Sequence, residues 1–182
     1  MKRFLAGGAA SVGEIGMLGA QLILDPGPYY GTWSGLLGAK TKDDFSLLVP
    51  VDPFEKRLNV LREAIAYKDH SRPDYFVIRF MEGGVFVSLV EVKWRSNSMS
   101  DSEIKTVVKN QLHGFMGFLE TLLEWQEKGG LWRRGFKVLL AEVALFGLRL
   151  SLADKLIDAQ VAQSCMHALG EMFANRKPIV LD

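Results

Sequence analysis

The centre of the chain most constrains the fold, because two apolar runs there are separated only by a short glycine-containing turn. Residues 75–80 and 85–94 are rich in valine and aromatic residues, which favour strands. Residues 81–84 between them predict a tight turn. The run Val85–Val90 is almost entirely apolar, as expected of a strand that is buried on both faces. We therefore expect a β-hairpin in the core of the protein.

The remaining segments predict helices around this hairpin. From apolar spacing we expect helices over residues 11–24, 53–66, 100–128 and 154–175, a strand over 45–51 and one or two strands within 136–150. Ser100 and Glu103 form a capping box at the start of the third helix. The tail 176–182 is a further strand or the beginning of a linker. This order predicts a single α/β domain, residues 1–182, with a mixed central sheet flanked by helices.

Composition excludes several classes of protein. Cys165 is the only cysteine, so no internal disulfide can form, which fits a reducing compartment. The net charge of +1 gives no overall nucleic-acid signature, although basic residues can still cluster locally. No apolar run approaches the length of about 18 residues that a membrane span needs. The apolar stretch at the start is too short for a signal peptide, and we expect a cytoplasmic protein without a membrane partner.

Three charged residues flank the predicted hairpin at the end away from its turn. If the turn is centred between Gly83 and Gly84, the numbers of paired residues sum to 167, and Asp74 lies opposite Lys93. Directly paired residues share a face of the sheet, and alternation along the strand places Glu91 on that same face. Asp74, Glu91 and Lys93 are therefore expected to converge.

Such a group suits phosphodiester hydrolysis. Two adjacent carboxylates repel each other unless a cation lies between them, and Mg²⁺ prefers carboxylate oxygens and water. A metal held there can orient water and neutralise charge on a phosphodiester, while a lysine stabilises the charge that develops. The alternative is an ion pair between Asp74 and Lys93 at the edge of the sheet, with Glu91 solvated.

The motif Arg72-Pro73-Asp74, followed after sixteen residues by Glu91-Val92-Lys93, resembles the signature of the PD-(D/E)XK nuclease superfamily. The resemblance implies a restriction-endonuclease-like fold in which the aspartate and the glutamate hold Mg²⁺, or Mn²⁺ in its place, and the lysine assists hydrolysis. It implies an enzyme that cuts nucleic acid, with DNA as the favoured substrate, and it leaves open a helicase or motor partner and a homodimer.

Members of this superfamily often carry a further metal-binding glutamate on the first core helix. Glu14 is our candidate, because it lies on the helix that opens the domain; the alternative reading is a capping box with Ser11. Glu63 is the rival if residues 53–66 form the first core helix.

Gln111 lies inside the apolar stripe of the third predicted helix, where a buried amide needs hydrogen-bonding partners. The fragment Gln111-Leu112-His113-Gly114-Phe115 resembles the glutamine-bearing helix of the RecB-like branch, in which the glutamine contacts the active site. A structural hydrogen bond between the helix and the sheet is the alternative.

Basic residues follow the Glu-x-Lys motif. Arg95, Lys105 and Lys109 are candidates for phosphate contacts, and the two lysines lie one helical turn apart. The alternative is that they belong to an ordinary solvated helix face. The competing hypothesis for the whole chain is a catalytically inactive module of the same fold, which binds DNA or a partner protein within a larger DNA-processing assembly.

Overall fold

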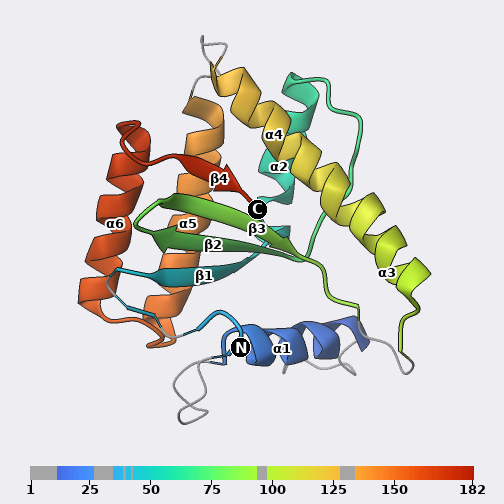
Figure 1. The fold of residues 1–182 in the computed structure, drawn as a ribbon, viewed down its shortest axis with the longest axis horizontal. Coiled ribbons are helices and arrows are strands. Elements are labelled where there is room, and N and C mark those ends of the chain that lie inside the picture. Colours follow the sequence, from blue (N-terminus) through green and yellow to red (C-terminus); the bar gives the residue numbers. More distant parts are fainter. Residues whose placement is uncertain (1–11, 27–34, 39, 42, 94–97, 128–133) are drawn as a thin grey trace.

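The computed structural model describes residues 12–26, 35–38, 40–41, 43–93, 98–127 and 134–182, without the side chains of residues 12–15, 126 and 127. A four-stranded sheet forms the centre (Figure 1), with the strands β1 (Phe45–Pro50), β2 (Tyr75–Met81), β3 (Gly84–Val90) and β4 (Ile179–Leu181) in that spatial order. The pairs β1–β2 and β2–β3 are antiparallel, whereas β4 runs parallel to β3. The sheet is therefore mixed, as predicted.

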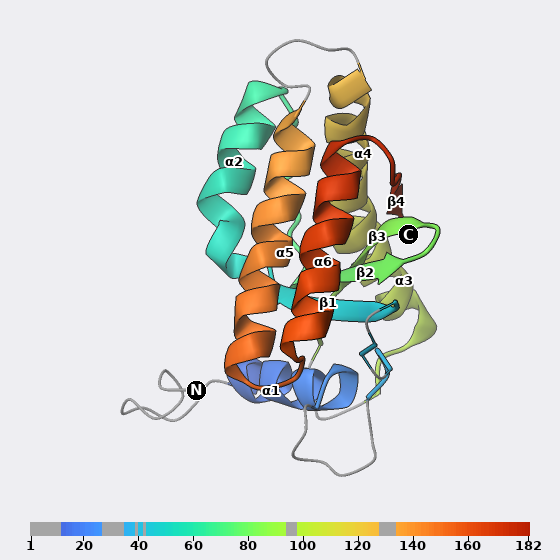
Figure 2. The same ribbon diagram turned by 90° about the vertical axis from the view of Figure 1, so that its left-hand side faces the viewer.

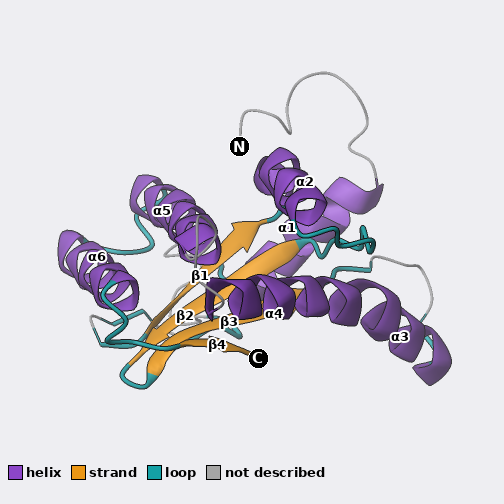
Figure 3. Cartoon of the chain, turned by 90° about the horizontal axis from the view of Figure 1, so that it is seen from above, coloured by secondary structure: helices purple, strands orange, loops and turns teal. Residues whose placement is uncertain are grey.

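Helices flank this sheet, which confirms the predicted α/β class. They are α1 (Val12–Leu24), α2 (Glu55–Ala64) after the short 3₁₀ turn η2 (Asp52–Phe54), α3 (Asp101–Val107), α4 (Gly114–Glu127), α5 (Gly135–Ala153) and α6 (Ala159–Phe173). Between α3 and α4 the π-helical segment η3 spans Val108–His113. The capping box of Ser100 and Glu103 at the start of α3 is confirmed. Seen from above, α2, α4, α5 and α6 cover the sheet and α3 extends beyond it (Figure 3).

One face of the sheet forms the hydrophobic core together with α2, α4, α5 and α6. The phenyl rings of Phe76 and Phe115 join the sheet to α4, with their centroids 5.7 Å apart. Helix α1 runs nearly perpendicular to α5 (Figure 2). The hydroxyl group of Tyr75 donates to the carbonyl oxygen of Met17 over 3.2 Å, so α1 passes beside the start of β2. No described helix is both long enough and apolar enough to cross a membrane.

The register of the hairpin differs from the predicted one by two residues. Tyr75 pairs with Val90 and Met81 pairs with Gly84, so the paired numbers sum to 165 and the loop consists of Glu82 and Gly83 alone. Asp74 therefore neighbours Glu91 across the hairpin, and its predicted position opposite Lys93 was wrong. A shift of two residues preserves the alternation of faces, so Glu91 and Lys93 keep their expected common side.

The strands predicted within residues 136–150 were also wrong, because this segment is the helix α5. Its buried positions include Phe136, Leu140, Val143 and Gly147, which recur every three or four residues. Helix α5 contacts α4, α6 and β1, so most of its circumference is apolar and the helical period is hard to see in the sequence. The tail, by contrast, contains the strand β4, one of the two predicted alternatives.

Candidate functional site

Asp74 is fixed by the backbone at the point where β2 begins. Its N–H group donates to the carbonyl oxygen of Val90 over 3.0 Å, and its carbonyl oxygen accepts from the N–H group of Val51 over 3.0 Å. Its side-chain Oδ2 accepts from the N–H group of Val92 over 2.7 Å. The carboxylate is therefore directed towards the segment that leaves β3, which carries Glu91 and Lys93.

Glu91 follows β3 and combines deep burial with a single ion pair. Its side chain is only 5% exposed, and Oε1 accepts from the Nζ atom of Lys93. The other oxygen, Oε2, is buried and has no hydrogen-bonding partner among the described residues. A carboxylate oxygen in this condition is costly to bury, so a cation or a hydrogen-bond donor beside it would stabilise the folded state.

The electrostatics of Glu91 reflect this crowding. Burial raises the pKa of its carboxyl group above the ordinary value of 4.5, and the neighbouring charge of Asp74 raises it further. The hydrogen bond from Lys93, the charge of Lys93 and that of Arg72 oppose this rise in pKa. The structure thus brings Asp74, Glu91 and Lys93 together, with Arg72 close enough for its charge to act on the same carboxyl group.

Gln111 lies on η3, at the point where the helix widens from α-helical to π-helical hydrogen bonding. Its side-chain Oε1 is buried and has no partner among the described residues. Short π-helical segments occur frequently at functional sites, because they redirect side chains that a regular helix would place elsewhere. Within the described part of the chain, no hydrogen bond joins Gln111 to the sheet, so the alternative structural role gains no support there.

Glycines after η3 allow the loop before β2 to approach this helix closely. A Cβ atom added to Gly114 would lie 2.3 Å from the carboxylate of Asp69, and one added to Gly117 would lie 2.8 Å from the hydroxyl of Tyr67. That hydroxyl donates to the carbonyl oxygen of Gly114 over 2.8 Å. The segment that leads into Asp74 is therefore packed directly on the helix that carries Gln111.

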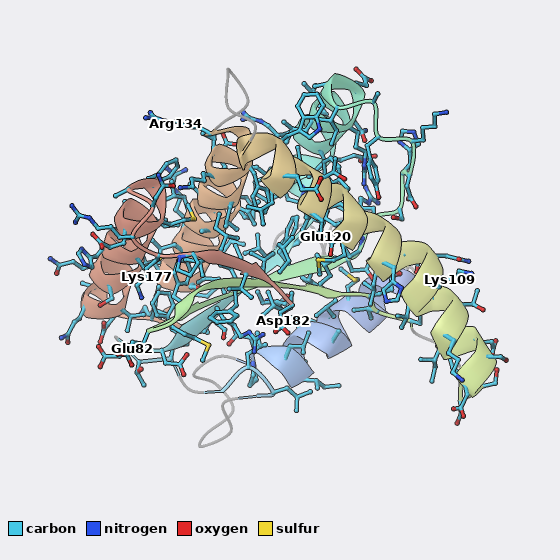
Figure 4. The ribbon with its side chains drawn as sticks, turned by 45° about the horizontal axis from the view of Figure 1, so that its top comes forward. Glu82, Lys109, Glu120, Arg134, Lys177 and Asp182 are labelled. Atoms are coloured by element: carbon cyan, nitrogen blue, oxygen red, sulfur yellow. The ribbon has the colours of Figure 1, made fainter. Side chains whose placement is uncertain are left out.

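The other predicted site residues have different outcomes. Lys105 and Lys109 are exposed, on α3 and η3 respectively, and Figure 4 labels Lys109 on the side of the molecule away from the hairpin turn. Glu63 is exposed on α2. Glu14 lies on α1, but its side chain is outside the described part of the structure, and so is Arg95. These five assignments to metal or phosphate binding stay predictions.

The sequence prediction missed two arginines beside the site. Arg62 is 3% exposed, and its guanidinium group lies over the rings of Phe115 and Phe118, at 5.3 and 5.0 Å from their centroids. Arg72 pairs with Asp52 over 3.2 Å and with Glu55 over 3.0 Å. Arg62 has a recognisable signal, because it falls within the apolar stripe of its helix, where a cation is unusual.

A cavity of about 420 Å³ adjoins these residues. Its walls come from α2, from the loop before β2 and from η3, and its lining residues are Glu55, Asn59, Arg62, His70, Ser71, Arg72 and Gln111. Arg72 lines this cavity and is also close enough to Glu91 for its charge to act there, although neither Asp74 nor Glu91 lines the cavity. Within the described side chains, no group of three or more His, Cys, Asp or Glu residues is arranged to hold a metal ion.

Comparison of the chain with protein-family models, with curated proteins and with solved structures finds no match.

Proposed function

We propose that the protein hydrolyses phosphodiester bonds of nucleic acid in a metal-dependent reaction at Asp74, Glu91 and Lys93. The observation that carries the proposal is the condition of Glu91, a buried carboxylate next to a second carboxylate, with one oxygen unpartnered. Both features favour a bound cation, because a divalent ion relieves the repulsion and occupies the free oxygen.

Asp74 and Glu91 would hold Mg²⁺, with Mn²⁺ as a substitute. Only two carboxylates meet in the described part of the site, which suits an ion that keeps several waters and takes further oxygen ligands from the substrate. When bound, the ion supplies Lewis-acid stabilisation of the phosphoryl oxygens and acidifies the attacking water. The buried position of Glu91 keeps its Oε2 free of competing water.

Lys93 would stabilise the charge that develops on the phosphate. Its Nζ atom already contacts Oε1 of Glu91, and its side chain is 31% exposed, so it is both close to the carboxylates and accessible to a substrate. A preorganised cation at a developing charge is worth more than one recruited from solvent. Gln111, whose side-chain Oε1 has no partner among the described residues, would orient the substrate or the water.

The sheet is compatible with the restriction-endonuclease-like fold that the sequence motif implies. The antiparallel β1–β2–β3 unit, the helices that follow it and a fourth strand parallel to β3 place the Asp and the Glu-x-Lys segments at neighbouring strand ends. DNA as the substrate rests on the motif resemblance. We include this fold assignment and this substrate in the proposal.

The second candidate is an inert module of the same fold that binds DNA or a protein partner. The ion pair between Lys93 and Glu91 favours it, because an internal cation already balances that carboxylate without a metal. The two candidates differ in metal dependence, since the inert module has no requirement for Mg²⁺.

A cleavage assay tests the proposal. Wild-type protein with Mg²⁺ or Mn²⁺ is expected to cleave fluorescently labelled DNA, and Lys93→Ala is expected to lower the rate by about 10²- to 10³-fold. Circular dichroism and thermal unfolding should show that the variant remains folded, because Lys93 is partly exposed. Lys56→Ala, at an exposed position of α2, is the matched control and should lower the rate far less. Equal cleavage by wild type and Lys93→Ala would refute the role of Lys93.

A further inference from the structure

Arg62 is a buried cation that has no carboxylate in hydrogen-bonding contact among the residues that the structure describes. Its Nη1 donates to Oδ1 of Asn59 over 3.1 Å and its Nη2 donates to the carbonyl oxygen of Ser71 over 2.5 Å. Both acceptors are neutral. Its Nε is buried and has no partner among the described residues. Asp69 is the carboxylate whose charge acts most strongly on Arg62, and it makes no ion pair with it in the described structure.

The cost of burying the charge of Arg62 is only partly offset by these contacts. A guanidinium group removed from water is costly unless it is both hydrogen-bonded and paired with an opposite charge. The faces of Phe115 and Phe118 attract the cation but do not neutralise it. Burial consequently lowers the pKa of Arg62. An anion placed beside Arg62 would remove this cost.

The cavity of about 420 Å³ described above opens beside this guanidinium. Its other lining groups supply hydrogen-bond donors from two separate segments: His70, Ser71 and Arg72 in the loop before β2, and Gln111 on η3. Arg72 is shared between Asp52 and Glu55, whose side chains are 74% and 56% exposed, so solvent weakens that hold. The cavity therefore offers two guanidinium groups to one ligand.

We propose that this cavity binds a phosphate group. A phosphate has several acceptor oxygens in a tetrahedral arrangement, which matches donors that converge from different directions, and arginine binds it through paired N–H groups. A half-turn of the Gln111 amide presents its NH₂ group to the same ligand. The binding itself is independent of metal chemistry; its assignment to a substrate strand rests on the proposed nuclease function.

Asn59 provides the most direct test. In Asn59→Asp, a carboxylate oxygen replaces the amide oxygen that accepts from Nη1 of Arg62. This internal anion should replace the ligand. By isothermal titration calorimetry in EDTA, wild type should bind inorganic phosphate, and Asn59→Asp should bind it at least about tenfold more weakly, the loss of one charge-assisted contact. Without ligand, the melting temperature of Asn59→Asp should exceed that of wild type.

Two further variants control for the added charge and for a failure of Asn59→Asp to fold. Asn110→Asp makes the same charge change at an exposed position of η3 and should leave phosphate affinity within about twofold of wild type. If Asn59→Asp does not fold, Arg72→Gln at the rim should still weaken phosphate binding by several-fold. Absence of phosphate binding by wild type, or equal affinity in wild type, Asn59→Asp and Arg72→Gln, would overturn the proposal.

Oligonucleotides then identify the source of the phosphate. Competition by strands with a 5′- or 3′-phosphate, but not by hydroxyl-ended strands, would assign the cavity to a strand terminus, and equal competition by all would assign it to an internal phosphate. Asp74→Asn should retain phosphate binding while losing cleavage. Phosphate binding without any metal-dependent cleavage would refute the nuclease proposal alone, and cleavage without phosphate binding would refute the cavity alone.

Discussion

The two ends of the β2–β3 hairpin differ in how far their buried polar groups are hydrogen-bonded. At the turn, the Nζ atom of Lys177 donates to the carbonyl oxygen of Met81 over 2.7 Å, and the rings of Phe45 and Phe80 stack with centroids 4.8 Å apart. At the other end, three side-chain atoms are buried and have no partner in the described part of the chain: Glu91 Oε2, Arg62 Nε and Gln111 Oε1. Figure 4 shows Lys177 and Glu82, of the turn end, on the far side of the molecule from Lys109.

This difference distinguishes the residues that stabilise the fold from the residues that we propose to be functional. Proteins satisfy nearly all of their buried polar atoms, so each exception needs an explanation. At the turn end the contacts of Lys177 serve the fold, although Nε of Arg79 in β2 is also buried without a partner among the described residues. At the Asp74 end two acceptors and a donor are unpartnered among the described residues, and these are the atoms that we propose to face a cation and a phosphate.

The largest expected effect compares one charged side chain from each end. Asp74→Asn should lower Mg²⁺-dependent cleavage by about 10³-fold, since a metal contact is worth several kcal/mol in the transition state. Lys177→Met should leave the cleavage rate unchanged but lower the free energy of unfolding by about 1 kcal/mol, because it removes the donor to Met81. Steady-state cleavage rates and urea unfolding measure both. Similar rate losses in the two variants would abolish the distinction between the ends.

A stability change in the core should leave the site unaffected. In Gly147→Ala the added Cβ would lie 2.5 Å from Cγ2 of Val49, where α5 packs on β1, and we expect a loss of about 1–3 kcal/mol by urea unfolding. Gly170→Ala on α6 is the matched control, because nothing lies within 4 Å of its added Cβ, and it should gain up to about 1 kcal/mol. A similar loss of stability in both variants would contradict the packing described for α5.

Gln111→Met should lower activity without lowering stability. The apolar side chain removes an unpartnered buried acceptor, so the free energy of unfolding should rise or stay within about 1 kcal/mol of wild type. Cleavage should nevertheless fall, because the amide no longer meets the substrate. Loss of more than about 2 kcal/mol with normal activity would instead identify Gln111 as a structural residue.

The smallest expected effect is a dependence of stability on pH. Because the pKa of Glu91 is raised in the folded state, its contribution to stability is full below about 4.5 and is lost as the pH rises through the raised value. Glu91→Gln removes this loss, so its melting temperature should exceed that of wild type at neutral pH by about 2–4 °C. The advantage should vanish near pH 4. A variant less stable than wild type at neutral pH would show that the Lys93 ion pair outweighs burial.

The hairpin and the convergence of its charged ends could be predicted from the sequence, because a glycine turn between two apolar runs leaves few alternatives. The register was displaced by two residues, since the loop contains only Glu82 and Gly83, yet the shared face survived because side chains alternate with a period of two. Helix α5 was mistaken for strands, because contacts on several sides conceal its period.

Other parts of the site could not be predicted from the sequence. The π-helical segment around Gln111 depends on a change in backbone hydrogen bonding that residue spacing does not reveal. The cavity depends on three segments that meet only in the fold. Arg62 could have been predicted from the sequence, because it shares the buried face of α2 with Leu58 and Leu61. A cation at such a position indicates a specific partner.

The most direct test of the central claim is a calorimetric titration with Mn²⁺ in the absence of nucleic acid. The carboxylate pair predicts saturable binding by wild type, and loss of this binding in both Asp74→Asn and Glu91→Gln, while Glu124→Gln on the exposed side of α4 retains it. If wild type gives no heat of binding, or if Asp74→Asn binds Mn²⁺ as wild type does, the end of the hairpin is not a metal site and the nuclease proposal is wrong.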